Sequence, residues 1–172
     1  YATPWTNYTW SDFGGTWRIQ TNRARCNTSV AAGNLRFNTS TTEMSVVANV
    51  VRAATTYSGA LMINHDGTNA FLARVRTNTG TTSWLELVQY NGTFTVISQV
   101  SIPIATTYVV RIESYGDTTN ATMKVYLGGV LKINTTLSPA QAALAHGASA
   151  VGVGLMCNSD ISTAFDFFHV DV

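Results

Sequence analysis

Three glycine-bearing dipeptides, each set between two runs of β-branched and aromatic residues, constrain this chain more than any other feature. They are Asp66-Gly67, Asn91-Gly92 and Gly128-Gly129. Such dipeptides supply the positive φ angles that tight hairpin turns require. The sequence therefore predicts three antiparallel hairpins, which pair Ser58–His65 with Asn69–Arg76, Ser83–Tyr90 with Thr93–Val100, and Ala121–Leu127 with Val130–Asn134.

Further short β-like segments follow at a spacing of about 8–12 residues, which is typical of sandwiches and barrels. These are Thr16–Gln20, Arg23–Cys26, Asn34–Phe37, Met44–Ala53, Tyr108–Ser114, Val151–Met156 and Ala164–Val172. Only 11% of the residues are charged, against about 25% in an average protein, and the polar residues include many threonines, which favour strands. We therefore expect one all-β domain over residues 1–172, built as a two-sheet antiparallel β-sandwich.

One short helix is predicted between two late strands. Ser138 can cap its N-terminus, Pro139 suits the first helical position, and Gly147 can end it. We expect this helix, Pro139–His146, to cover one end of the sandwich.

Alternation along the strands predicts which side chains face the core, because successive side chains of a strand point to opposite faces. The residues expected to point inward are Phe71, Val75, Val110, Ile112, Met123 and Val125. Their neighbours along the strands, which include several arginines and tyrosines, are then expected to point outward.

The charge pattern argues against two classes of partner. Ten basic and nine acidic residues give a net charge of +1, with no run of one sign. Nucleic-acid binding needs a clustered basic footprint, so we expect no nucleic-acid partner. No apolar stretch approaches the roughly 20 residues of a membrane span, so we expect no membrane-spanning segment.

Cys26 and Cys157 are the only cysteines, which excludes a metal site built on several thiolates. Two alternatives remain open at this point. The pair is either two reduced core cysteines or one long-range disulfide, and the second implies an oxidising compartment.

Several segments follow one another in an order that matches a known group of domains. They are Gly14–Ile19 with Asn22–Arg25, Ser58–Ile63 with Asp66-Gly67 and Phe71–Val75, Val125–Leu131, and Val151–Leu155 with Phe165–Val170. The series resembles the concanavalin A-like lectin/glucanase superfamily, in particular its laminin-G-like jelly-roll domains. This resemblance implies a jelly roll of two curved sheets. It does not imply a function, because one fold hosts many functions.

Catalysis is not expected. Retaining glucanases of this superfamily place carboxylates on one strand in a Glu-x-Asp-x-x-Glu pattern, and a glycosidic bond is cleaved between two carboxyl groups about 5 Å apart. No two acidic residues of this chain are placed in that way on a central strand. His65, His146 and His169 share no segment, and we expect each to have a structural or solvent-facing role.

Binding is the better hypothesis, because aromatic rings can stack on the apolar faces of sugars. If the strands that carry the outward arginines and aromatic residues belong to one sheet, these side chains would line one shallow surface that receives a glycan or a partner. Its predicted ligand-binding residues are Trp84, Arg74, Arg76, Arg111, Glu113 and Tyr126. The alternative is a solvated sheet face on which charges such as Arg111 and Glu113 pair with each other.

No cofactor is expected. A structural calcium ion is a weaker hypothesis, for which Asp12, Asp166 and Asp171 are the candidate oxygen ligands. The three tryptophans near the N-terminus, Trp5, Trp10 and Trp17, are expected to pack in the core or at its rim.

Two functions fit these features. The first is a non-catalytic carbohydrate-binding or adhesion module, extracellular, on a cell surface or on a virion. The alternative is a structural assembly protein, such as a virion decoration, fibre or filament subunit, that self-associates through the sandwich. A large apolar interface between subunits would favour this alternative.

Overall fold

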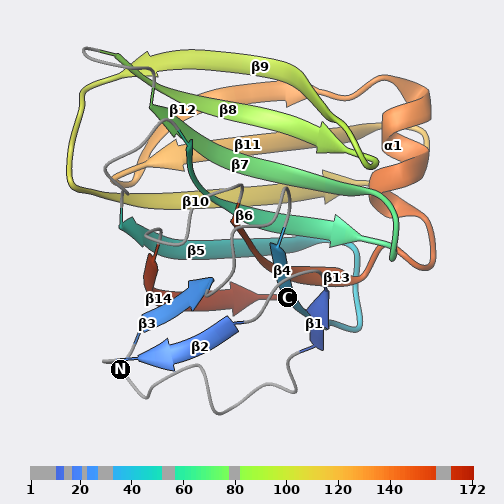
Figure 1. Ribbon diagram of the computed structural model, residues 1–172. Helices are drawn as coiled ribbons and strands as arrows, with labels where there is room; N and C mark the ends of the chain where they lie inside the picture. Colours follow the sequence, from blue (N-terminus) through green and yellow to red (C-terminus); the bar gives the residue numbers. More distant parts are fainter. Residues whose placement is uncertain are drawn as a thin grey trace.

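Two antiparallel sheets of seven strands each form the computed structural model. It describes residues 11–13, 17–20, 23–26, 33–51, 57–77, 82–157 and 164–172. In spatial order, sheet 1 contains β1 (Ser11–Phe13), β4 (Gly33–Asn38), β13 (Gly152–Cys157), β6 (Tyr57–His65), β7 (Ala70–Thr77), β8 (Ser83–Tyr90) and β9 (Phe94–Ile102). Sheet 2 contains β12 (Val130–Thr136), β11 (Ala121–Leu127), β10 (Thr107–Gly116), β5 (Met44–Val51), β14 (Ala164–Asp171), β3 (Arg23–Cys26) and β2 (Trp17–Gln20). The sheets lie against each other (Figure 1), so the predicted all-β sandwich is confirmed.

All three predicted hairpins are present, as β6–β7, β8–β9 and β11–β12. Their turn glycines have the positive φ angles that the dipeptides indicated, with 109° at Gly67, 92° at Gly92, and 56° and 81° at Gly128 and Gly129. The other predicted strands are also found; Arg23–Cys26 has the predicted ends, and the predicted ends Thr16 and Ala53 lie outside the described residues. The sequence did not indicate β1, because its three residues are too few to show an alternating pattern.

The main core lies between the two sheets. All six residues predicted to point inward are almost fully buried in it. Burial alternates along β5 and in most of β11, as expected for strands with one face in the core and one outside. Trp17 packs against the same core, with its ring centroid 6.2 Å from that of Phe165, whereas Trp5 and Trp10 lie outside the described residues.

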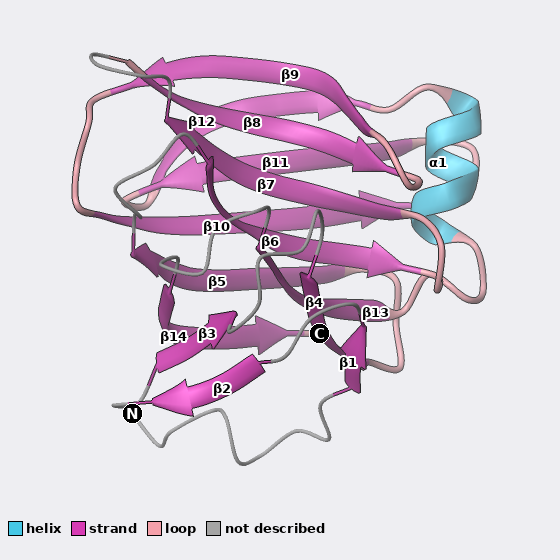
Figure 2. Ribbon diagram, in the orientation of Figure 1, coloured by secondary structure: helices cyan, strands magenta, loops and turns pink. Residues whose placement is uncertain are grey.

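The predicted helix is found as α1 (Pro139–His146). Ser138 caps it, since its backbone N–H donates to Gln141 Oε1 at 3.0 Å and its Oγ accepts from Gln141 N at 3.4 Å. Ala142 and Ala145 enter the core, and Figure 2 shows the helix at one end of the sandwich, where it was expected. No helix among the described residues is long and apolar enough to span a membrane.

Cys157, which is buried at the end of β13, is disulfide-bonded. Cys26 is the only other cysteine of the chain. Of the two alternatives that the sequence left open, the disulfide is therefore the one found. A bridge to Cys26 closes a loop of about 130 residues, for which the chain-entropy model gives a stabilisation of about 4–5 kcal/mol.

Two histidines hold loops to strands, which agrees with their expected structural role. His146 lies between Ser114 Oγ and Thr42 Oγ1, each 3.1 Å from one of its ring nitrogens. His65 Nδ1 accepts a hydrogen bond of 3.0 Å from the backbone N–H of Gly67 and contacts Arg36 Nη1. Burial, followed by the positive charge of Arg36, lowers the pKa of His65 to about 4.

This low pKa makes the stability of the fold depend on pH. A histidine that has a pKa of about 6.5 when unfolded and about 4 when folded binds more protons in the unfolded state between those values, so stability is lost as the pH falls through that window. We expect His65 to contribute about 2–3 kcal/mol to the decrease in unfolding free energy between about pH 7 and pH 4.5. Urea unfolding at a series of pH values measures this decrease.

The variant for this test is His65→Gln, which keeps a side-chain acceptor and cannot titrate. Its unfolding free energy should fall less steeply with acid than that of the unaltered protein. His169→Gln, at an exposed histidine of β14, is the matched control, because it removes an imidazole that is not buried. Equal slopes in all three proteins would contradict the role given to His65.

Candidate functional site

The structure separates the six predicted ligand-binding residues into two groups. Arg74, Arg76 and Trp84 lie on β7 and β8 of sheet 1, whereas Arg111, Glu113 and Tyr126 lie on β10 and β11 of sheet 2. Their neighbours along each strand are buried between the sheets, so the two groups point away from each other on opposite sides of the sandwich. The prediction that all six share one surface is wrong. Strand alternation indicates which face of a strand is outward, but not to which sheet the strand belongs.

On sheet 2, the outward side chains Arg111, Tyr115 and Tyr126 form a network around Glu113. Tyr115 Oη and Tyr126 Oη each donate to Glu113 Oε2 at 2.8 Å, and Arg111 Nη1 lies 3.2 Å from Glu113 Oε1. The guanidinium of Arg111 lies over the ring of Tyr126, 3.9 Å from its centroid. Each of these groups already has a partner within the network. This half of the predicted set therefore matches the alternative of a sheet face whose own charges pair.

Glu113 also alters the acidity of its tyrosine partners. Burial, together with the hydrogen bond to Glu113 and its negative charge, raises the pKa of Tyr115 to about 12. The same causes raise the pKa of Tyr126. Ionising either phenol would place a second negative charge beside the carboxylate and remove the hydrogen bond that the phenol donates.

The network can be tested through this titration. In Glu113→Gln, we expect the pKa of Tyr115 to fall toward the ordinary tyrosine value of about 10, because the adjacent charge is gone. An ultraviolet-absorbance titration of tyrosinate, compared between variant and unaltered protein, measures the change. Asp171→Asn removes a carboxylate from an exposed end of β14 and serves as the control. Superimposable curves for Glu113→Gln and the unaltered protein would contradict the network.

The other half of the predicted set lies on the outward side of sheet 1, over β7, β8 and β9. Strand register places the side chains in rows across these three strands: Arg76, Trp84 and Ser101 in one row, Arg74, Glu86 and Gln99 in the next, and Ala70, Tyr90 and Phe94 at the far end. We call this surface the β7–β9 face, with Arg74, Arg76, Trp84, Glu86, Tyr90 and Phe94 as its defining residues. A small apolar cluster that includes Met62, Leu72 and Val88 lies on the same side of the sheet.

An ionic triad forms the centre of the β7–β9 face. Glu86 Oε2 accepts from Arg74 Nε at 2.7 Å and lies 2.6 Å from Arg74 Nη2, and Glu86 Oε1 accepts from Arg76 Nε at 2.7 Å. The exposed fraction of the side chain is 0% for Glu86, 8% for Arg74 and 30% for Arg76. The carboxylate is thus buried beneath two guanidinium groups, of which only that of Arg76 is substantially accessible.

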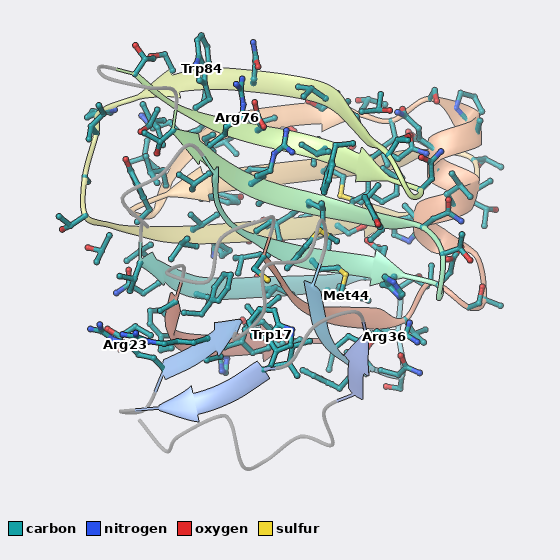
Figure 3. All side chains as sticks on the ribbon, viewed as in Figure 1. Trp17, Arg23, Arg36, Met44, Arg76 and Trp84 are labelled. Atoms are coloured by element: carbon teal, nitrogen blue, oxygen red, sulfur yellow. The ribbon has the colours of Figure 1, made fainter. Side chains whose placement is uncertain are left out.

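Aromatic side chains border the triad. Trp84 is the cross-strand neighbour of Arg76 and is partly exposed, and Figure 3 shows the two side chains close together at the same end of β7 and β8. On the other side, the guanidinium of Arg74 lies 4.9 Å from the centroid of Phe94, which in turn lies 4.9 Å from that of Tyr90. The face therefore combines fixed charges with partly exposed rings.

Glu86 and Phe94 were not among the six predicted residues, although both are central to this face. Glu86 was on the outward side of its strand by alternation, but its partners depend on the pairing of β7 with β8. Phe94 follows the Asn91-Gly92 turn and is paired with Tyr90. Hairpin register read from that turn could have placed it beside Tyr90.

Among the described residues, the two glutamates of the central strands do not form a pair. Glu86 and Glu113, the two glutamates of the central strands, lie in different sheets. Along β4, β6, β7, β8, β9 and β13, Glu86 is the only acidic residue. Both oxygens of Glu86 are bonded to arginines. No second carboxyl group lies opposite Glu86 on these strands, whereas cleavage of a glycosidic bond uses a pair of carboxyl groups.

The candidate calcium ligands have other partners where they are described. Asp166 forms an ion pair with Arg23 at 3.2 Å, and Asp171 forms one with His169 at 2.8 Å. The side chain of Asp12 lies outside the described residues. Among the described residues, no three histidine, cysteine, aspartate or glutamate side chains form a group that could hold a metal ion.

Solved structures with a similar fold are numerous, whereas comparison of the sequence finds no matching family model and no matching curated protein. The carbohydrate-binding module CBM66 from Bacillus subtilis is 20% identical, with a TM-score of 0.71, over 96% of this chain and 98% of that one. A xylan β-1,4-xylosidase from Bacillus halodurans C-125 is 12% identical, with a TM-score of 0.62, over 89% of this chain and 33% of the enzyme. A legume lectin-like domain from Entamoeba histolytica is 7% identical, with a TM-score of 0.57, over 94% and 89% of the two chains.

These similarities show the fold. Several of the similar structures are concanavalin-like jelly rolls, and the chain described here has that same fold, as the order of its sequence motifs indicated. At these levels of identity, the site residues and their ligands have to be argued from the chain itself.

Proposed function

We propose that this concanavalin-like jelly roll is a non-catalytic carbohydrate-binding module and that its β7–β9 face is the binding surface. The observation that carries the proposal is the buried Glu86, which holds two arginines on the outward side of a sheet beside a partly exposed tryptophan. The arginines are thereby fixed in position before a ligand arrives. Binding a sugar to such a surface requires little further ordering of side chains.

The chemistry of the face suits a sugar. Trp84 offers a partly exposed ring for stacking against the apolar face of a pyranose or furanose, while Arg76 and the exposed Gln99 and Ser101 offer hydrogen-bonding groups for hydroxyls. Two of the similar structures are named as a carbohydrate-binding module and a lectin-like domain, which supports the same class of ligand. The absence of a second carboxylate on the strands of this face supports binding without turnover.

The disulfide supports a location outside the reducing cytosol, because disulfides persist mainly in oxidising compartments. We therefore place the module in an extracellular setting, on a cell surface or on a virion, with a glycan or polysaccharide as its partner. In that setting, we propose that the module serves adhesion to a glycan-coated surface.

Structural assembly remains the second candidate, and one observation favours it. Val109, Val130 and Leu131 are 44%, 58% and 44% exposed, and they lie on β10 and β12, the two strands that flank β11 in sheet 2. Leu131 pairs with the outward Tyr126, so it and Val109 are exposed apolar side chains on the outward side of sheet 2 that another copy of the chain could cover.

Glycan-array binding with matched variants tests the proposal. We expect at least one class of glycan to bind and Trp84→Ala to weaken that binding by about 1–3 kcal/mol, by analogy with stacking of bases on aromatic side chains. Tyr115→Ala is the matched control, because it removes an exposed aromatic side chain from the opposite sheet. Affinity is measured by isothermal titration calorimetry, and circular dichroism verifies that each variant is folded.

The opposite results are equally informative. Loss of binding in Tyr115→Ala but not in Trp84→Ala would move the site to sheet 2. No binding to any glycan, combined with a concentration-dependent mass in solution that Leu131→Asp reduces to that of the monomer, would favour assembly over carbohydrate binding.

A further inference from the structure

We infer that the ligand of the β7–β9 face is an acidic sugar, and that Arg76 binds its carboxylate while Trp84 stacks on its ring. This inference rests on the proposed function, because it names the class of glycan bound at that face. It is carried by the excess of one positive charge in the triad of Arg74, Glu86 and Arg76 and by the different ways in which Glu86 holds its two arginines.

Among the described residues of the β7–β9 face, Glu86 is the one acidic residue and Arg74 and Arg76 are the basic ones. Within the triad, one carboxylate serves two guanidinium groups, which leaves one positive charge in excess. A charge held in partly buried surroundings is stabilised by a nearby opposite charge. A carboxylate on the ligand would supply that charge, whereas a neutral sugar would not.

Arg74 is already occupied. Its Nε and Nη2 both contact Glu86 Oε2, at 2.7 and 2.6 Å, and its guanidinium carbon lies 4.9 Å from the ring centroid of Phe94. Its side chain is 8% exposed. Arg74 therefore acts as a positioning residue that fixes the carboxylate of Glu86, and it has little surface to offer a ligand.

Arg76 is held differently. Glu86 binds only its Nε, at 2.7 Å, and its terminal Nη1 and Nη2 make no hydrogen bond to any of the described residues. The side chain of Arg76 is 30% exposed, against 8% for Arg74, so Arg76 is the arginine of the triad that can offer donors to a ligand. Two adjacent N–H donors of a guanidinium match the two oxygens of a carboxylate in a bidentate pair.

Trp84 gives the pair its preference for a sugar acid over a simple carboxylate. It is directly opposite Arg76 in the β7–β8 register. In a hexuronate, the carboxylate is attached directly to the sugar ring. A ring that stacks on Trp84 can thus present its carboxylate to the neighbouring guanidinium, and the two contacts together select a uronic acid.

The experiment compares oligosaccharides that differ only in charge. Oligomers of galacturonate, mannuronate and glucuronate are each titrated beside the same oligomer after chemical reduction of its carboxyl groups to primary alcohols. We expect at least one acidic oligomer to bind about tenfold or more tightly than its reduced form, and this preference to shrink as salt is raised. The variants are Arg76→Gln, which should abolish the preference, and Arg76→Lys, which should retain part of it.

The control is Arg111→Gln, which removes an arginine of similar side-chain exposure, 39% against 30%, from the opposite sheet. It should leave the preference unchanged. Glu86 and Arg74 are not used, because removing either would leave a buried charge without its partner and threaten the fold. Thermal melting verifies each variant, and the comparison of acidic with reduced oligomers on the unaltered protein decides the question even if Arg76→Gln does not fold.

Three results would overturn the inference. Equal affinity for acidic and reduced oligomers, weakened by Trp84→Ala, would leave carbohydrate binding in place and remove the acidic ligand. An acid preference that Arg111→Gln abolishes and Arg76→Gln does not would place the carboxylate on sheet 2. Failure to bind any oligomer or any glycan of the array would overturn the proposed function together with the inference.

Discussion

The packing of two apolar sheet faces against each other is the interaction on which every other feature of this protein depends. Phe71 and Val75 from sheet 1 and Ile112 and Val125 from sheet 2 are fully buried in one core between the sheets. The side chains that alternate with them must point outward. The core thus creates two outward faces without specifying what either of them does.

The charged side chains of the two outward faces are paired in different ways. On sheet 2, Glu113 accepts hydrogen bonds from two phenols and pairs with the guanidinium of Arg111. On sheet 1, Glu86 is buried between two arginines and leaves the outer part of Arg76 accessible. On sheet 2, both oxygens of the carboxylate have partners on the same face, which stabilises that face. A buried carboxylate that fixes an accessible guanidinium resembles a binding site prepared in advance.

Much of the fold could be predicted from the sequence because its signals are local. The turn glycines at 67, 92, 128 and 129 have the positive φ angles expected for hairpin turns. Pro139–His146 forms the predicted helix between the cap Ser138 and Gly147. The six predicted core residues are buried as alternation indicated. In each case, the decisive interactions join residues close in sequence or depend only on a period of two along one strand.

The candidate site could be predicted only in part. The sequence by itself determined which side chains point outward, so Arg76, Trp84 and Tyr126 are all on outer faces. Only the tertiary structure decided which of them lie together, because the sheet to which a strand belongs depends on pairings between strands far apart along the chain. Those pairings separated Arg111 from Arg74 and placed Glu86 between two arginines. The alternation of residues along one strand does not indicate which strand lies beside it. Charged side chains on two strands can pair only when those strands are neighbours in a sheet.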